Sequence, residues 1–227
     1  MKTINDYIKL DLYKIDYKQV LNNYSILIIG LFIMSFGVAL SVRSNLGTTP
    51  ISCIPYVLSF KFPLSLGTIT ILFNTLLIII QILILRSKFP KIQLLQIIVN
   101  FIFGYFIDFS LYLTINIIPT SYVMQWFICF ISCIIIALGV FFEVNSHAIV
   151  LPGEGVSLAI HSVTHTDFGK LKTYFDTTNV ILGVIMSLIF FGTFKGVGLG
   201  TIFAGVVVGC IVRFYRKLFL LLTNKHQ

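Results

Sequence analysis

The chain contains six apolar runs that are each long enough to cross a lipid bilayer, at 24–43, 66–85, 92–115, 122–144, 172–194 and 197–219. About 20 mostly apolar residues are needed to cross the hydrocarbon core as a helix. Only 11% of the residues are charged, well below the usual fraction in soluble domains. We therefore expect an all-α membrane protein with six transmembrane helices embedded in the lipid bilayer.

The segment before the first run, residues 1–23, has a pattern of its own. Ile4, Ile8, Leu12 and Ile15 share one helical face, and the intervening lysines can meet lipid headgroups. This predicts an interfacial helix, with a soluble tail as the alternative. The first run has no small-residue cleavage site, so we expect it to be a retained span and not a signal peptide.

Two further apolar segments, 50–60 and 152–163, are too short to cross. If neither crosses, both termini and the 86–91 and 145–171 connections share one side, which then carries all Lys and Arg residues except Arg43, Lys61 and Lys195. The positive-inside rule therefore predicts cytoplasmic termini, with residues 220–227 as a cytoplasmic tail.

Several classes of function are disfavoured. The net charge is +8, but the chain has too little polar surface to form a nucleic-acid site. We therefore expect no nucleic-acid partner. The four cysteines form neither a disulfide framework nor a zinc motif. His161 and His165 lie at a metal-compatible spacing, but no further ligands accompany them. We expect no enzyme, no cofactor and no metal.

The sequence contains an internal repeat. One ungapped register pairs Gly37 with Gly139, Pro50 with Pro152, Gly67 with Gly169 and Asn74 with Asp176, and a slightly longer one pairs Gly104 with Gly209. The unit is a span, a short segment and two spans, so 24–115 and 122–219 are predicted as the two membrane repeats. Because three spans is an odd number, the repeats are inverted, an architecture typical of secondary transporters. An ancestral duplication with a purely structural product is the alternative.

The two short segments are predicted to be re-entrant half-helices. Pro50 and Pro152 suit the first helical position, and a half-helix of this length covers about half of the hydrocarbon core. Both helices would then start near the midplane, where their positive dipole ends favour an anionic group such as a carboxylate.

Polar residues at the same depth are the candidate binding residues. Asp176 and Asn74 are expected near the midplane, and Lys172 can reach Asp176 on one helical face. Glu154 either belongs to the site or only caps its own helix, and Asp176 either belongs to the site or only bonds a neighbouring helix. The full predicted set is Ser52, Asn74, Gly153, Glu154, Gly155, Lys172, Asp176 and Asn179.

Two other features are interpreted as structural. Asp108 and Arg213 occupy equivalent repeat positions, but the inversion places them at opposite ends of the membrane, so they are not expected to pair. Gly205 and Gly209 are spaced for close helix packing.

Three stretches, GVALSVRSNLGTTPISCIPYVLS, PGEGVSLAIHSVTHTDFGKLKTYFD and GVGLGTIFAGVVVGCIVRF, resemble the YczE/YyaS family of bacterial integral membrane proteins, related to YitT-type proteins. The resemblance covers about residues 25–215 and rests on Pro50, Ser52, Pro152, Gly153, Glu154, Gly155, Lys172 and Asp176. It implies a bacterial inner-membrane location and names no substrate.

These observations favour a secondary transporter of a small molecule bound between the two half-helices, and the helix dipoles favour an anionic one. The alternative is a non-transporting accessory or assembly protein of a biosynthetic or export complex. Whether the chain forms a homodimer or has a membrane partner is left open by the sequence.

Overall fold

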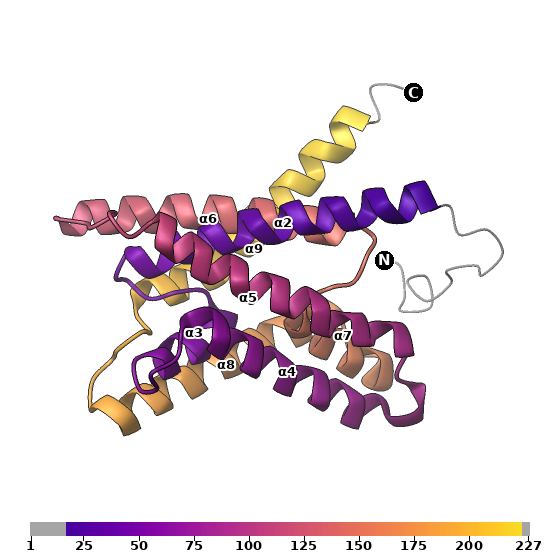
Figure 1. The fold of residues 1–227 in the computed structure, drawn as a ribbon, viewed down its shortest axis with the longest axis horizontal. Helices are drawn as coiled ribbons and strands as arrows, with labels where there is room; N and C mark the ends of the chain where they lie inside the picture. The colour runs from indigo at the N-terminus through magenta and orange to yellow at the C-terminus, as the bar shows by residue number, and fades with distance from the viewer. Residues whose placement is uncertain (1–16, 224–227) are drawn as a thin grey trace.

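The computed structural model describes residues 17–223, and within them the chain is all-helical (Figure 1). The long helices are α2 (Tyr17–Arg43), α4 (Leu66–Leu85), α5 (Gln96–Leu113), α6 (Tyr122–Asn145), α8 (Phe168–Phe191) and α9 (Leu199–Thr223). Two short helices, α3 (Pro50–Ser59) and α7 (Pro152–Thr164), follow α2 and α6. The 3₁₀ turns η1 (Arg86–Lys88) and η2 (Lys91–Leu95) connect α4 to α5.

Five helical segments in the described part of the chain are long and apolar enough to cross a membrane: α2, α4 with η1, η2 with α5, α6 and α8. The sixth expected span corresponds to α9, which has 25 residues but is not one of the five. Its C-terminal half carries Arg213, Arg216 and Lys217. The fold is therefore a multi-span helical bundle, and the count of six spans stays a prediction.

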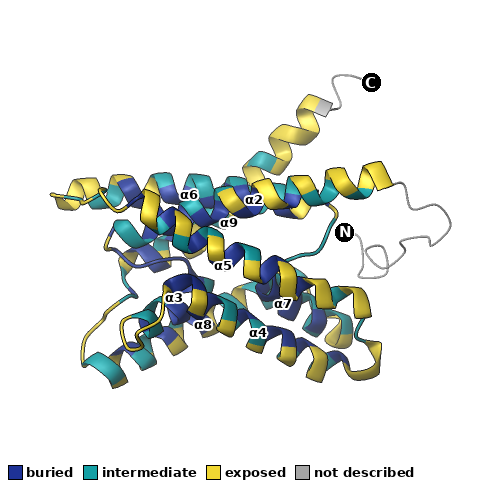
Figure 2. Ribbon diagram, viewed as in Figure 1, coloured by how far each residue is buried: buried dark blue, intermediate teal, exposed yellow. Residues whose placement is uncertain are grey.

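Helices α2 and α6 form the centre of one layer and lie side by side (Figure 1). Glycines allow their backbones to approach closely. A Cβ built on Gly37 would lie 2.6 Å from Cγ1 of Ile136, and one on Gly139 would lie 2.5 Å from Cβ of Met34. The main apolar core lies around α2, whose buried residues meet buried residues of α5 and Ile136 of α6. Figure 2 shows that the helices are buried on their inner faces and exposed on their outer faces, and many of the exposed residues are large and apolar.

Helices α4 and α8 lie in the other layer, and both short helices pack against them (Figure 1). α3 packs against α8 and α4, and α7 packs against α4 and α8. α5 joins the layers by packing against both α2 and α4, whereas α9 packs mainly against α6 and contacts α3. The C-terminal part of α9, drawn in yellow, leaves the bundle (Figure 1).

The two short helices are too short to cross the hydrocarbon core. With 10 and 13 residues, α3 and α7 rise about 15 and about 20 Å, against the ~30 Å of the hydrocarbon core. Each begins with a proline after an extended residue, Thr49 or Leu151. Because proline lacks an N–H and has a fixed φ, it is favoured at this first position.

α3 runs alongside the second half of α8 and in the same direction. Near its start, Sγ of Cys53 donates to the carbonyl of Asn179 at 3.1 Å. Near its end, the ring of Phe60 lies 6.4 Å from the ring of Phe191, centroid to centroid.

α7 runs back along the first half of α8. A three-residue connection, 165–167, joins the end of α7 to the start of α8, and the first turn of α7 is held beside the second turn of α8 by an ion pair between Glu154 and Lys172. Together with the direction of α3, this means that the two short helices start near the middle of α8 and point in opposite directions.

The predicted N-terminal interfacial helix lies largely outside the described residues. Its last part, 17–23, belongs to α2 and is continuous with the first span. At the other end, α9 continues as far as Thr223, into the segment predicted as a tail.

Candidate functional site

Three charged side chains meet where α7 and α8 lie together. Nζ of Lys172 lies 3.1 Å from Oε1 of Glu154 and 3.1 Å from Oδ1 of Asp176. Their side chains are between 19% and 27% exposed. One ammonium is thus shared between two carboxyl groups.

Local sequence brings the triad together. Lys172 and Asp176 are four residues apart on α8 and therefore share a face. Asp167 begins α8 by accepting the N–H of Lys170 at 3.1 Å, and His165 ends α7 in the left-handed conformation with φ of 55°. This turn reverses the chain, so that the first turn of α7, with Glu154, faces Lys172.

The starts of the two short helices touch beside the triad. The side chain of Ile51 in α3 occupies the place where a Cβ on Gly153 of α7 would lie. Nε2 of Gln81 in α4 donates to the carbonyl of Pro152 at 3.2 Å, and a Cβ on Gly155 would lie 2.5 Å from Oε1 of Gln81. Gly153 and Gly155 are therefore small because α3 and α4 lie against them.

A fourth charged residue, Glu143 in α6, was not predicted from the sequence. It is 2% exposed, and its Oε1 accepts the N–H of Leu151 at 2.7 Å, at the residue just before α7. Its carboxylate interacts electrostatically with Glu154 and Lys172, and its Oε2 is buried without a hydrogen bond. An isolated acid inside an apolar run is the sequence signal that could have identified this position, since such residues are costly in a membrane.

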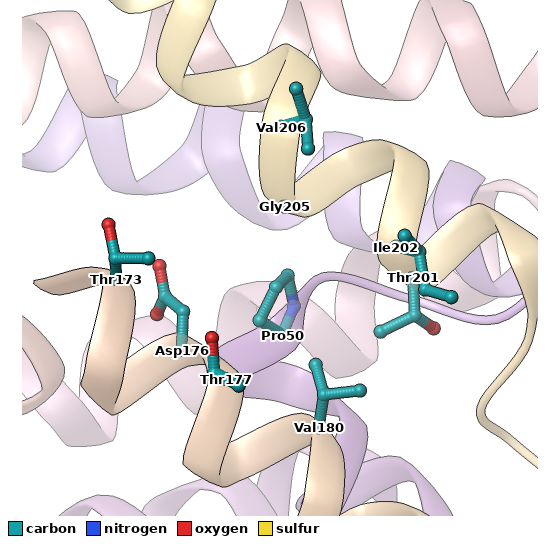
Figure 3. A pocket seen from close by; sticks show the side chains of 9 residues that line it. All are labelled: Pro50, Thr173, Asp176, Thr177, Val180, Thr201, Ile202, Gly205 and Val206. Carbon is teal, nitrogen blue, oxygen red and sulfur yellow. The ribbon is translucent and has the colours of Figure 1, made fainter.

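A pocket of about 290 Å³ lies between α8 and α9, with Pro50 of α3 at its inner end (Figure 3). The carboxylate of Asp176 and the hydroxyl of Thr173 point from α8 toward α9 (Figure 3). The lining residues are Pro50, Thr173, Asp176, Thr177, Val180, Thr201, Ile202, Gly205 and Val206. The pocket thus opens directly onto one member of the ion triad.

The other predicted polar residues lie apart from this pocket. Ser52 is buried in α3 and accepts the hydroxyl of Thr49 at 3.1 Å. Asn179 on α8 donates to the carbonyl of Phe175 at 2.9 Å. Neither residue lines the pocket.

Asn74 lies in the interface of α4 with α5. Its Nδ2 donates to Oδ1 of Asn100 at 2.9 Å, and Nδ2 of Asn100 donates to the carbonyl of Ile71. Asn74 is buried and does not line the pocket. The structure therefore brings Glu154, Lys172 and Asp176 together, and it places Asn74 in an interhelical hydrogen bond.

Asp108 and Arg213 have separate partners. Asp108 on α5 accepts the N–H of Gly67 at 2.8 Å and the hydroxyl of Ser65 at 2.6 Å, so it ties α5 to the start of α4. Nη2 of Arg213 lies 3.3 Å from Sγ of Cys210 on the same helix.

The histidine pair belongs to the connection between α7 and α8. Nδ1 of His161 lies 2.6 Å from the carbonyl oxygen of Thr166. Across residues 17–223, His, Cys, Asp and Glu form no group of three with a metal-binding arrangement.

Comparisons with known proteins assign the chain to a protein family. The family model described as "Family of unknown function (DUF6198)" matches residues 21–217. The chain is 30% identical over 189 residues to the uncharacterized protein YyaS of Bacillus subtilis (strain 168), covering 82% of this chain and 89% of that protein. No solved structure matches the chain significantly. The multi-span membrane protein described here therefore belongs to the DUF6198 family, and it is a homologue of YyaS.

Proposed function

We propose that this chain is a secondary transporter of a small molecule, built from two inverted repeats with six spans and cytoplasmic termini. The observation that carries the proposal is a pattern of contacts. For several contacts between the two halves, the contact between the repeat-equivalent residues is also present. One pair of helices departs from this pattern.

The first matched pair lies between α2 and α6. Gly37 packs against Ile136, and Gly139 packs against Met34. The repeat register that pairs Gly37 with Gly139 also pairs Met34 with Ile136. Exchange of the two halves therefore converts one contact into the other, as a two-fold axis between α2 and α6 requires.

A second matched pair involves the short helices. Gly155 of α7 packs against Gln81 of α4, and Cys53 of α3 packs against Gly183 of α8, where a Cβ would lie 2.9 Å from Sγ. The register pairs Cys53 with Gly155 and Gln81 with Gly183.

A third contact joins two residues that are equivalent to each other in the repeat. The register pairs Ile51 with Gly153, and these two residues touch each other. A two-fold axis therefore passes close to this contact, at the meeting point of the two short helices. Inverted repeats with half-helices meeting on the axis are a frequent plan of secondary transporters.

One helix pair breaks this symmetry. In the first half, Gly67 of α4 lies against the backbone of Gly104 in α5 and against Asp108, without room for a Cβ. The equivalent glycines are Gly169 of α8 and Gly209 of α9. Neither has an atom of the other helix within 4 Å of its Cβ position.

The asymmetry supports alternating access. The outer end of the α4–α5 pair is closed by Asp108, whereas α9 diverges from the cytoplasmic start of α8 (Figure 1). In a symmetric pair of repeats, the opposite arrangement is available at similar cost, with α8 and α9 closed and α4 and α5 apart. Alternation between the two would expose a central site first to the cytoplasm and then to the outside.

The transported molecule would bind at the triad of Glu154, Lys172 and Asp176, at the inner end of the α8–α9 gap. Charged side chains within a membrane protein are costly and mark functional positions by default. Here they lie where the two half-helices begin.

Uptake by reconstituted vesicles tests this function before the substrate is known. Proteoliposomes are incubated with a pool of small metabolites, and their contents are analysed by mass spectrometry. We expect at least one compound to accumulate with the wild-type protein and not with Asp176→Asn. The control is Asp167→Asn, which removes a charge from the same helix outside the pocket and keeps a good capping residue. Equal contents in wild-type and Asp176→Asn vesicles would contradict transport through this site.

A further inference from the structure

We propose that the pocket between α8 and α9 binds a small organic cation with an apolar body, whose charge lies against Asp176. The inference deepens the proposed function, because it assigns the chemical class of the transported molecule. It rests on three properties of the pocket: its charge, its walls and its size.

The charge around the pocket is negative. The charged groups that interact with Asp176 are Lys172 and Glu154, so two acids share one ammonium. In a low-dielectric surrounding, an uncompensated negative charge strongly favours a cation nearby and repels an anion.

The positive N-terminal ends of α3 and α7 do not reverse this preference for a cation. Positive dipole ends favour anions in general, but Glu154 already lies in the first turn of α7 and complements that end. At the start of α3, the first residue is Pro50, which has no N–H to offer. The anionic ligand expected from the helix dipoles is therefore disfavoured by the side chains that surround them.

The walls of the pocket suit an apolar body. Pro50, Val180, Ile202 and Val206 supply aliphatic surface, whereas Asp176 is the single acidic or basic residue in the lining. Dehydrated inorganic cations require several oxygen ligands in a closed shell. One carboxyl group and three threonines on otherwise apolar walls do not form such a closed shell, and they fit a weakly hydrated organic cation better.

Hydroxyls beside Asp176 provide additional acceptors. The hydroxyl of Thr173 donates its proton to the carbonyl of Gly169 at 2.9 Å. Its oxygen therefore remains free to accept a hydrogen bond from a ligand. The volume of about 290 Å³ lies near the lower end of ligand pockets. The pocket is therefore suited to a compact molecule.

Equilibrium binding of benzyltrimethylammonium to the purified full chain tests the proposal, with the protein in a nonionic maltoside detergent. Benzyl alcohol and benzenesulfonate carry the same ring with no charge and with a negative charge. We expect saturable binding of the cation by calorimetry, with at least tenfold weaker binding of the other two probes. Equal or tighter binding of benzenesulfonate, or no saturable binding of the cation, would overturn the proposal.

Two pairs of variants locate the binding. Asp176→Asn is expected to weaken cation binding at least tenfold, and Asp167→Asn to leave it within threefold. Ile202→Lys places an ammonium in the pocket wall and is expected to abolish binding, whereas Phe214→Lys, at a position of equal 62% exposure on the same helix, is expected to preserve it. Binding that survives both pocket substitutions would show that the cation associates elsewhere, in the detergent or on the apolar surface, and would refute the assignment.

Failure of this inference is distinguishable from failure of the proposed function. If no cation binds, the proposed alternating movement of α8 and α9 still stands, because that movement is tested by distance measurements that need no ligand. Cation binding in a protein whose helices do not alternate would instead leave a binding pocket without transport.

Discussion

Ile51 and Gly153 touch at the start of the two short helices, and the side chain of Ile51 fills the space that a Cβ on residue 153 would need. The two positions are equivalent in the sequence repeat. The contact therefore links the start of α3 to the start of α7, next to the ion triad. Its removal or overfilling will be felt by both halves.

Substitution of Gly153 by alanine is expected to destabilise the protein by about 1–3 kcal/mol, because the added methyl overlaps Ile51 in a packed site. Ile51→Ala in the same chain should restore part of the loss. Gly209→Ala is the control, since open space surrounds that position and alanine is the better helix former. Thermal unfolding in detergent measures the three variants, and equal effects at 153 and 209 would contradict the contact.

Substitution of Lys172 by glutamine leaves two carboxylates without their shared cation. We expect a loss of about 1–3 kcal/mol, less than for a fully buried pair because the side chain is 27% exposed. Adding Asp176→Asn should recover part of this loss, so the two effects are not additive. Lys170→Gln, at an exposed position on the same helix, should change stability little. Strict additivity in the double variant would show that the triad is not coupled.

Glu143 holds the backbone just before α7 through the N–H of Leu151. Glu143→Ala removes the only acceptor recorded for that N–H within the described residues and is expected to cost about 1–3 kcal/mol. Glu143→Gln keeps an acceptor oxygen at the same position and should cost less. A glutamine variant as unstable as the alanine variant would mean that the negative charge, and not the hydrogen bond, stabilises the loop.

The short helices illustrate what the sequence makes predictable. Their lengths and the prolines at 50 and 152 are local features, and the structure confirms two non-crossing helices at 50–59 and 152–164. The i, i+4 spacing likewise predicts that Lys172 reaches Asp176, and the ion pair is present.

The position of Asn74 illustrates what the sequence leaves undetermined. Its repeat partner is Asp176, which lines the pocket, whereas Asn74 is hydrogen-bonded to Asn100 between α4 and α5. The difference arises because α4 and α5 are packed together while α8 and α9 are apart. A sequence repeat predicts equivalent positions, but it does not predict which pair of helices packs closely.

The residues of α9 that line the pocket were not predicted either, because the sequence does not show which helices pack closely. Gly205 and Gly209 were interpreted as packing residues, because close helix contact is the common role of such spacing. In this conformation Gly205 lies in the pocket wall and Gly209 has open space around it.

The orientation of the chain is tested by reporter fusions. A fusion after Lys88 or at the C-terminus is expected to report cytoplasm, and a fusion near Thr120 to report the outside, because this arrangement places most Lys and Arg residues in the cytoplasm. An outside signal after Lys88 would remove the six-span topology and the inversion of the repeats.

The most direct test of the account is a pair of distances measured by electron spin resonance in lipid nanodiscs, one across α8 and α9 and one across α4 and α5. The first uses the exposed native Cys210 with Gly169→Cys, and the second uses Leu64→Cys with Tyr112→Cys in a Cys210→Ser background. Alternating access predicts two distance populations for each pair, a closed one and an open one. A single distance across α8 and α9 under all conditions would contradict it and would favour a static accessory protein.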